Sequence, residues 1–391
     1  NKQIFVKIKK KHMHIAIDVR PLMEKELTGV GEYTLNLLTE VLKQDNKNEY
    51  YLFFNSRKSV LSNLPKFKQK NVHYCGFNWP NKLLNLSLKL FKYPKLDQWI
   101  MDKYHPPKID LFFFPNISFL ATKCPYIITS HDLSFEFFPE FLSLKRRLWH
   151  EIINPKKLFV NAKQIIAVSD NTEDDLFQKY SLDVNRIKKI YSGITPNYKI
   201  INHEDSKFKK IKQKYSLPEK FILFLGTIEP RKNILGLIEA FNLLDKEEQN
   251  IPPLILVGKL GWKYKKIIKA AEENKKIRFI KYIKAQEKRY FYNAATLFVY
   301  PSFYEGFGFP PLEAQRCGCA VVTANNSSLI EICSNNTIFV DPNNLTDLKN
   351  GIKAVLKTTS QTAKPSATID VWDWTETARQ TIALFEKTKN S

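Results

Sequence analysis

Short apolar runs alternate along the chain with longer segments in which apolar residues recur at helical spacing. The apolar runs predict buried strands, and the periodic segments, such as residues 32–42 directly after the first run, predict helices. The predicted strands comprise residues 14–19, 50–55, 111–115, 126–130, 164–169, 187–191, 221–226, 254–258, 278–283 and 296–300. Such an alternation is typical of an α/β fold. Because 391 residues exceed one ordinary core, we expect two domains of roughly 180 residues each.

One predicted strand leads into a glycine-rich turn and a helix, the arrangement of an anion site. After the strand that ends at Tyr300, Gly306 and Gly308 let the backbone approach a ligand closely, and Pro310 and Pro311 open the next helix. Amide groups and the partial positive charge at a helix N-terminus suit a phosphate or diphosphate.

Two carboxylates, Glu305 and Glu313, bracket this turn. Both cannot face a phosphate, because like charges repel, but both could accept hydrogen bonds from sugar hydroxyls. Alternatively, Glu313 only complements the helix dipole and Glu305 is a solvated loop acid.

The sequence Pro-Ser-Phe-Tyr-Glu-Gly-Phe-Gly-Phe-Pro-Pro-Leu-Glu-Ala resembles the signature of family 4 retaining glycosyltransferases, two glutamates separated by seven residues. The resemblance implies the GT-B fold, in which two Rossmann-like domains face each other across a cleft. It further implies that Glu305 is a catalytic residue at the transferred sugar and that Glu313 binds the nucleotide ribose. Gly306, Phe307 and Gly308 would then belong to the donor-binding site.

Two segments of the first half carry the same resemblance. Thr28-Gly29-Val-Gly31 resembles the family's N-terminal loop, which implies that Gly29 and Gly31 lie against the donor diphosphate or the sugar; a plain tight turn is the alternative. His131 and Asp132 follow a strand, at the edge where open α/β sheets bind ligands. A lone histidine is often structural. The continuation His-Asp-Leu-Ser-Phe nevertheless resembles the family segment whose histidine lines the active site, with Asp132 either orienting it or capping the next turn.

Arg231 and Lys232 precede a predicted helix, where a guanidinium and an ammonium suit a diphosphate leaving group. As a bare pair they would be surface residues. Gly-Thr-Ile-Glu-Pro-Arg-Lys-Asn, however, resembles the family's donor-phosphate segment, although Thr227 stands where many members carry arginine. No Asp-x-Asp occurs, so we expect no catalytic metal and no cofactor beyond the nucleotide-sugar donor.

The resemblance extends from about Met13 to Phe385 and implies a domain division. We expect a basic extension at residues 1–12, an acceptor-side domain at 13–198, a nucleotide-sugar domain at 199–372, and a helix at 373–391 that crosses back to the first domain.

The family subgroup implied is that of mannosyltransferases of surface polysaccharide or O-antigen synthesis. We therefore expect retaining transfer of mannose from GDP-mannose to a glycan, lipid-linked in this pathway. A UDP-hexose or UDP-N-acetylhexosamine donor is the first alternative. A nucleotide-sugar epimerase of the same fold and a noncatalytic polyanion-binding scaffold are further ones, whereas an oxidoreductase would need a strand-linked Gly-x-Gly-x-x-Gly that the chain lacks.

Net charge, +22, favours anionic partners, but no nucleic-acid motif accompanies it, so we expect no nucleic-acid partner. Residues 81–104 mix leucines with lysines and predict a basic amphipathic helix that either touches an anionic membrane or packs on the sheet. No apolar run reaches the roughly 18 residues of a membrane-spanning helix, and the five cysteines lack the paired spacing of a zinc site. We therefore expect a cytoplasmic protein, which would be peripheral at the inner face of the plasma membrane if residues 81–104 bind lipid.

Overall fold

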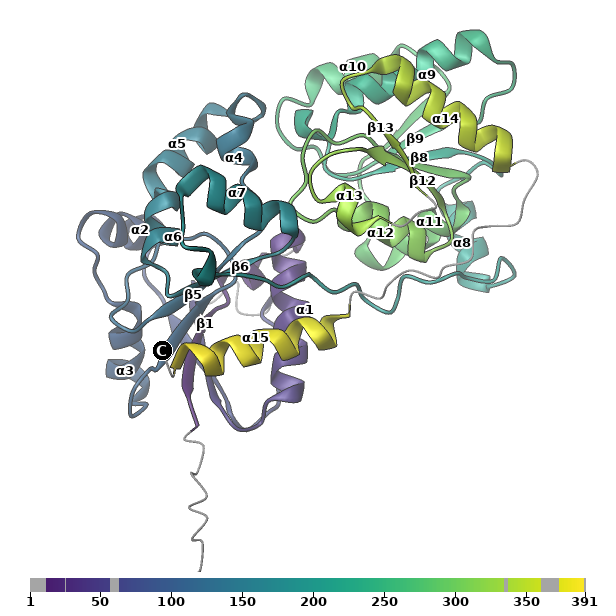
Figure 1. Ribbon diagram of the computed structural model, residues 1–391. Helices are drawn as coiled ribbons and strands as arrows, with labels where there is room; N and C mark the ends of the chain where they lie inside the picture. Colours follow the sequence, from purple (N-terminus) through teal and green to yellow (C-terminus); the bar gives the residue numbers. More distant parts are fainter. Residues whose placement is uncertain (1–11, 25, 57–62, 334–336, 360–372, 390–391) are drawn as a thin grey trace, which may run out of the picture.

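The computed structural model describes residues 12–24, 26–56, 63–333, 337–359 and 373–389. It contains two parallel sheets in separate domains, each covered by helices (Figure 1). The α/β prediction with two Rossmann-like domains is therefore correct. Parts of two predicted segments, the basic extension and the stretch before the last helix, lie outside the described residues.

The sheet of the first domain has seven strands in the order β3-β2-β1-β4-β5-β6-β7, and all their pairings are parallel. Its strands are β1 (His14–Asp18), β2 (Glu49–Asn55), β3 (Val72–Phe77), β4 (Leu111–Phe114), β5 (Tyr126–Ser130), β6 (Gln164–Ala167) and β7 (Ile187–Lys189). The strand order reverses between β1 and β4, and ligands of open α/β sheets bind beyond the carboxyl ends at such a point.

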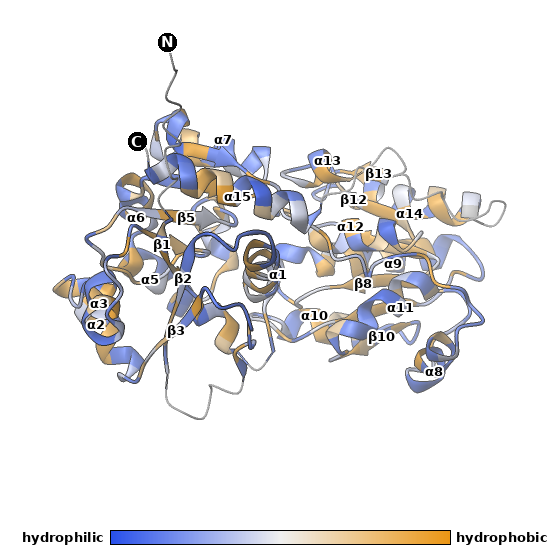
Figure 2. Ribbon diagram, turned by 90° about the horizontal axis from the view of Figure 1, so that it is seen from below, coloured by the Kyte–Doolittle hydropathy of each residue, from blue (hydrophilic) through white to orange (hydrophobic). Residues whose placement is uncertain are grey.

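Helices cover both faces of this sheet. They are α1 (Gly29–Gln44), α2 (Asn81–Leu90), α3 (Leu96–Tyr104), α4 (Ser134–Phe137), α5 (Leu144–Ile153), α6 (Pro155–Asn161) and α7 (Asp170–Tyr180). Buried residues of α1 pack against one face of the sheet, whereas those of α2, α3, α6 and α7 pack against the other. Figure 2 shows the corresponding mixture of hydrophobic and hydrophilic stretches along the helices.

Two sequence predictions in this domain were wrong in detail. Gly29 and Gly31 lie in the first turn of α1 and not in a loop before it, because Thr28 caps the helix with its side chain. The segment 81–104 forms two helices and not one, since residues 91–95, which include Pro94, interrupt it.

The second domain repeats the plan with the strand order β10-β9-β8-β11-β12-β13, again all parallel. Its strands are β8 (Ile222–Leu225), β9 (Leu254–Val257), β10 (Ile277–Ile280), β11 (Leu297–Tyr300), β12 (Ala320–Ala324) and β13 (Thr337–Val340). Its helices are α8 (Ser206–Lys214), α9 (Ile234–Glu247), α10 (Lys265–Glu272), α11 (Lys288–Ala294), α12 (Phe309–Arg316), α13 (Leu329–Ile332) and α14 (Leu345–Thr359). The order reverses between β8 and β11, which makes their carboxyl ends the expected ligand position.

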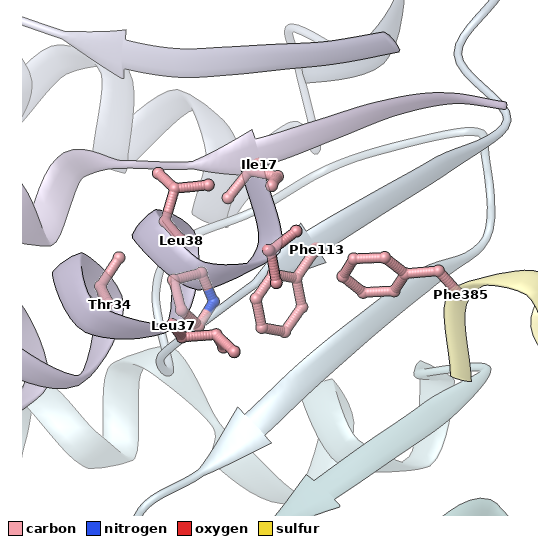
Figure 3. A pocket seen from close by; sticks show the side chains of 8 residues that line it. Ile17, Thr34, Leu37, Leu38, Phe113 and Phe385 are labelled. Atoms are coloured by element: carbon pink, nitrogen blue, oxygen red, sulfur yellow. The ribbon is translucent and has the colours of Figure 1, made fainter. Parts of the chain in front are cut away.

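The last helix, α15 (Trp374–Lys389), returns to the first domain and lies beside α1 (Figure 1). Figure 3 shows Phe385 of α15 pointing toward Phe113 of β4, with Thr34, Leu37 and Leu38 of α1 around them. The rings of Phe113 and Phe385 are 5.3 Å apart, and a cavity of about 10 Å³ lies among these side chains. The chain thus leaves the second domain and completes the core of the first.

No helix within the described residues is long and apolar enough to cross a bilayer.

Candidate active site

The candidate site forms where β8 and β11 end side by side in the sheet. A 3-10 turn (Pro230–Lys232) after β8 carries Arg231 and Lys232, and the loop between β11 and α12 carries Glu305. Gly308 caps α12 with a backbone φ of +96°, in the left-handed region that favours glycine, and Pro310 and Pro311 follow. The predicted strand, glycine turn and helix start are all present.

Glu305 forms the centre of a buried charge cluster. One carboxylate oxygen accepts hydrogen bonds from Lys232 Nζ, 2.5 Å away, and from Ser302 Oγ, 2.6 Å away. The other oxygen accepts from Arg231, 3.1 Å away, whose second nitrogen lies 3.3 Å from Glu229. The structure thus brings together Glu305, Arg231 and Lys232, three of the predicted site residues.

Electrostatics keep the Glu305 carboxylate charged despite its burial. Burial alone would raise the pKa of Glu305, but the adjacent Arg231 and Lys232 charges outweigh it and hold that pKa at about 2. Burial and the Arg231 charge lower the pKa of Lys232, and burial raises the pKa of Glu229. Arg231 and Lys232 both contact Glu305, so they can turn toward an entering anion only by giving up these contacts.

Glu229 was not predicted as a site residue. It is 3% exposed, lies beside Arg231, and belongs to the same Gly-Thr-Ile-Glu-Pro-Arg-Lys-Asn segment. The sequence did offer a signal for Glu229, because it directly precedes Pro230 and the basic pair Arg231 and Lys232.

Glu313 lies apart from Glu305, in a second buried group. It accepts a hydrogen bond from Tyr292 of α11 at 2.9 Å. Lys288 at the start of α11 pairs with Glu32 of α1 in the other domain at 3.3 Å. Burial lowers the pKa of Lys288, but Glu313 and Glu32 outweigh that effect and raise it, whereas burial raises the pKa of Glu313.

Tyr292, Lys288 and Glu32 were missed in the sequence, because nothing in their local patterns distinguishes them from packing or surface residues. Only the tertiary structure brings α1 and α11 together.

His131 lies at the end of β5, against the glycine turn of the second domain. Its Nε2 donates to the carbonyl of Pro115 at 2.8 Å, and its ring meets Tyr33 edge-on at 4.6 Å. Burial lowers its pKa, so the ring is neutral at pH 7. A Cβ on Gly306 would lie 1.7 Å from the His131 carbonyl oxygen, so the two segments touch backbone to backbone.

Asp132 caps the next turn and does not hydrogen-bond to the His131 ring in this structure. Its carboxylate accepts from the backbone and hydroxyl of Ser134, at 3.0 and 2.8 Å. Of the two roles left open by the sequence, the contacts match the cap.

The remaining predicted site residues occupy different surroundings. Gly29 has open space where a Cβ would project, whereas a Cβ on Gly31 would approach Leu27 and the Pro21 carbonyl within 3.0 to 3.2 Å. Phe307 is 5% exposed and packs beside Phe309, in a cluster shared with the first domain.

Comparison with solved structures defines the class of fold. Sucrose-phosphate synthase from Thermosynechococcus elongatus superposes with a TM-score of 0.72 at 19% identity, covering 96% of this chain and 99% of that one. Anabaena HepE in complex with UDP and glucose gives a TM-score of 0.68 at 20% identity, covering 96% and 100%. At these identities the likeness shows the fold alone, which is GT-B.

Sequence comparison then gives the family. The model of glycosyl transferases group 1 matches residues 205–369, and that of glycosyltransferase family 4 matches residues 27–198. O-antigen chain mannosyltransferase B of Escherichia coli is 30% identical over 375 residues, which cover 92% of this chain and 96% of that protein. The serotype-specific mannosyltransferase WbdA of Escherichia coli is 33% identical over 203 residues, 51% of this chain but 25% of its own. This chain belongs to the group 1, family 4 glycosyltransferases.

Proposed function

We propose that this glycosyltransferase moves mannose, with retention of configuration, from GDP-mannose to a growing lipid-linked glycan in O-antigen or surface-polysaccharide synthesis. The observation that carries the proposal is the buried contact of Glu305 with Arg231 and Lys232 at the head of α12. The relative that matches nearly the whole chain is an O-antigen chain mannosyltransferase, and the one that matches half of it is a serotype-specific mannosyltransferase; both support the sugar, and the first supports the pathway.

The residues suggest how the work would be divided. Arg231, Lys232 and the first amides of α12 would stabilise charge that develops on the leaving diphosphate. Glu305 would then exchange its cation contacts for hydroxyls of the transferred sugar, and Glu313, with Tyr292 beside it, would hold the ribose. With the cations in this role, the reaction needs no metal, and same-face attack assisted by the leaving phosphate would retain configuration.

The test is thermal stabilisation by GDP, UDP and ADP, measured with EDTA present, because a ligand that binds only the folded state raises the melting midpoint. A selective rise with GDP, followed by mannose transfer from GDP-mannose in EDTA, is the expected result. Stabilisation by none of the three, together with no transfer, would contradict the proposal.

A UDP-hexose is the alternative donor, and one observation favours it: HepE, which shares the fold, was solved with UDP and glucose and with UDP-glucose. A selective rise with UDP in the same measurement would replace the donor and keep the family.

We further propose that the protein works at the cytoplasmic face of an anionic membrane, through the outer sides of α2 and α5. Large apolar side chains on these helices and directly after α2 are 39 to 82% exposed: Leu83, Leu86, Leu90, Phe91, Tyr93, Leu144, Leu148, Trp149 and Ile152. Ile153 is the only buried residue of α5. Burial and the nearby Lys157 and Lys89 charges lower the pKa of Lys92, which places the end of α2 near α6.

The charge of this surface matches anionic lipid. Residues 81–95 and 143–157 together contain nine basic residues and one acidic residue, Glu151. The basic ones are Lys82, Lys89, Lys92, Lys95, Lys145, Arg146, Arg147, Lys156 and Lys157. Basic helices with an exposed apolar stripe bind the boundary between headgroups and acyl chains.

Sedimentation with vesicles tests this face. The protein should pellet with phosphatidylglycerol vesicles at low salt and not with phosphatidylcholine alone. The double substitution Lys145→Gln and Arg147→Gln should weaken binding, whereas Lys207→Gln with Lys210→Gln removes the same charge from exposed positions of α8 and should not. Equal loss in both double variants would show a response to net charge and refute a specific face.

A further inference from the structure

We propose that Tyr304 is a positioning residue whose hydroxyl holds the Glu305 segment against the His131 segment of the other domain. The inference rests on the proposed function, because it concerns how the two halves of that site are assembled. Tyr304 was not among the predicted site residues, and its side chain is not part of the charge cluster around Glu305.

The hydroxyl of Tyr304 spans the two domains. It donates to a carboxylate oxygen of Asp175 on α7 and accepts from the backbone amide of Leu133 at 3.2 Å. Leu133 follows His131 by two residues, and Tyr304 precedes Glu305 by one. One side chain thus connects the segments that carry the two candidate catalytic residues.

The backbone of Tyr304 is fixed from its own domain at the same time. Its carbonyl accepts from Arg231 of the same domain at 2.6 Å. Its ring, 6% exposed, packs instead near Phe138 of the first domain at 5.6 Å. A shift of Tyr304 would therefore move both a cation contact and Glu305.

Neighbouring contacts leave the same segment little freedom. Gly306 lies directly against the His131 carbonyl, and its own carbonyl accepts from the Thr172 hydroxyl of α7 at 3.3 Å. The loop between β11 and α12 is thus bonded to α7 twice, through the side chain of Tyr304 and through the backbone of Gly306.

The environment of Asp175 makes the hydrogen bond effective. Burial raises the pKa of Asp175, since the charged carboxylate is partly removed from water. In such a place a donor to the carboxylate is stronger than in water. Without the Tyr304 hydroxyl, the amide of Asn171, which donates to the same carboxylate oxygen at 2.8 Å, would remain as its donor from α7.

Tyr304→Phe removes the hydroxyl and keeps the ring, so it tests position without changing the packing. We expect kcat to fall by at least about tenfold while the Kd for the nucleotide diphosphate stays within about twofold, since the binding groups remain. Tyr50→Phe is the matched control: Tyr50 donates to Asp45 at 2.7 Å within the first domain and is fully buried. Loss of the Tyr50 hydroxyl should lower the stability of the protein without changing kcat.

Substitutions of Asp175 complete the test. Asp175→Asn keeps an oxygen acceptor and should retain most of kcat, whereas Asp175→Ala should match Tyr304→Phe, and the double variant should be no worse than either single one. An unchanged kcat in Tyr304→Phe, or additive losses in the double variant, would overturn the inference. The parent's activity separates the two proposals: a parent that transfers no sugar refutes the proposed function, whereas an active parent with an equally active Tyr304→Phe refutes only the positioning role.

Discussion

At the scale of single residues, the site is a balance of buried charges. Arg231 and Lys232 are held by Glu305 and Glu229, so the groups suited to a diphosphate are compensated internally. Removing either partner of a buried pair leaves the other uncompensated, which costs more than a surface ion pair is worth. Substitutions here therefore change both binding and stability, and the experiments must separate the two.

Lys232→Met should weaken the binding of the nucleotide diphosphate by at least about tenfold, because an ammonium at the phosphate is lost while the stem is kept. Isothermal calorimetry measures the Kd directly on the folded protein. Lys349→Met is the matched control, since Lys349 pairs with Glu247 between α14 and α9 and its side chain is only 14% exposed. An equal Kd in the Lys232 variant and the parent would refute a phosphate contact.

His150 should make stability depend on pH in mildly acidic solution. Burial lowers its pKa to about 4, and Arg146 adds to this against the opposing Asp132 and Glu136; the ring also stacks on Phe135 at 4.2 Å. Because the unfolded chain takes up the proton near pH 6.5 and the folded chain does not, the stability present above pH 6.5 is lost as the pH falls toward 4.

For this partly exposed ring the loss should be about 1 kcal/mol between pH 6.5 and 5. Urea unfolding at several pH values measures it. His150→Gln should flatten the slope over that interval, and an unchanged slope would show that other groups control it.

At the scale of elements, the site depends on where strands end. The turn after β8 and the loop after β11 meet because the two strands are neighbours. The first turn of α1, in the other domain, contacts the start of α11 through the pair of Glu32 with Lys288. The three glycines lie in different surroundings. Gly308 has a left-handed backbone, Gly306 lies in direct contact with the His131 carbonyl, and Gly29 faces open space.

Gly29→Ala tests whether that open space belongs to the donor. In the first turn of α1 the change should stabilise the protein by up to about 1 kcal/mol, because alanine favours the helix. If the donor approaches this turn, KM for the nucleotide sugar should rise several-fold. Thr39→Ala, further along α1 and exposed, should also stabilise and leave KM unchanged. A KM equal to the parent's in the Gly29 variant would remove Gly29 from the donor site.

At the scale of the whole molecule, α15 makes the two domains depend on each other. It follows the second domain in sequence, packs on α1 of the first, and carries Trp374, whose backbone occupies the space that a Cβ on Gly193 would need. Further contacts between the domains run through α7, where Glu331 accepts from the first amides at 2.8 and 3.1 Å. Stability and domain arrangement are therefore coupled.

Phe385→Ala should destabilise the first domain by about 3 to 5 kcal/mol, because it enlarges an existing cavity that the neighbouring side chains already fail to fill (Figure 3). Urea denaturation followed by tryptophan fluorescence measures this. Phe177→Ala, at a half-exposed position of α7, should cost far less. Equal costs would show that α15 does not complete the core.

The sequence by itself determined the strands, the turn chemistry and the family. Apolar runs are local and buried on both faces of a parallel sheet, so their pattern predicts most strands. The strands β3, β12 and β13 were not among the predicted ones. The signature around Glu305 and the basic turn at Arg231 and Lys232 are likewise contiguous. The start of α1 and the interruption of residues 81–104 were missed because capping and helix ends depend on side-chain geometry.

Only the tertiary structure decided what these pieces contact. The pairing of Lys288 with Glu32, the bridge from Tyr304 to Asp175 and the return of α15 join residues far apart in the sequence, whose local patterns are ordinary. Glu305 and Glu313, near in sequence, point into separate buried groups because the turn and first residues of α12 come between them. Contacts of this kind follow from the packing of two domains, which no local spacing encodes.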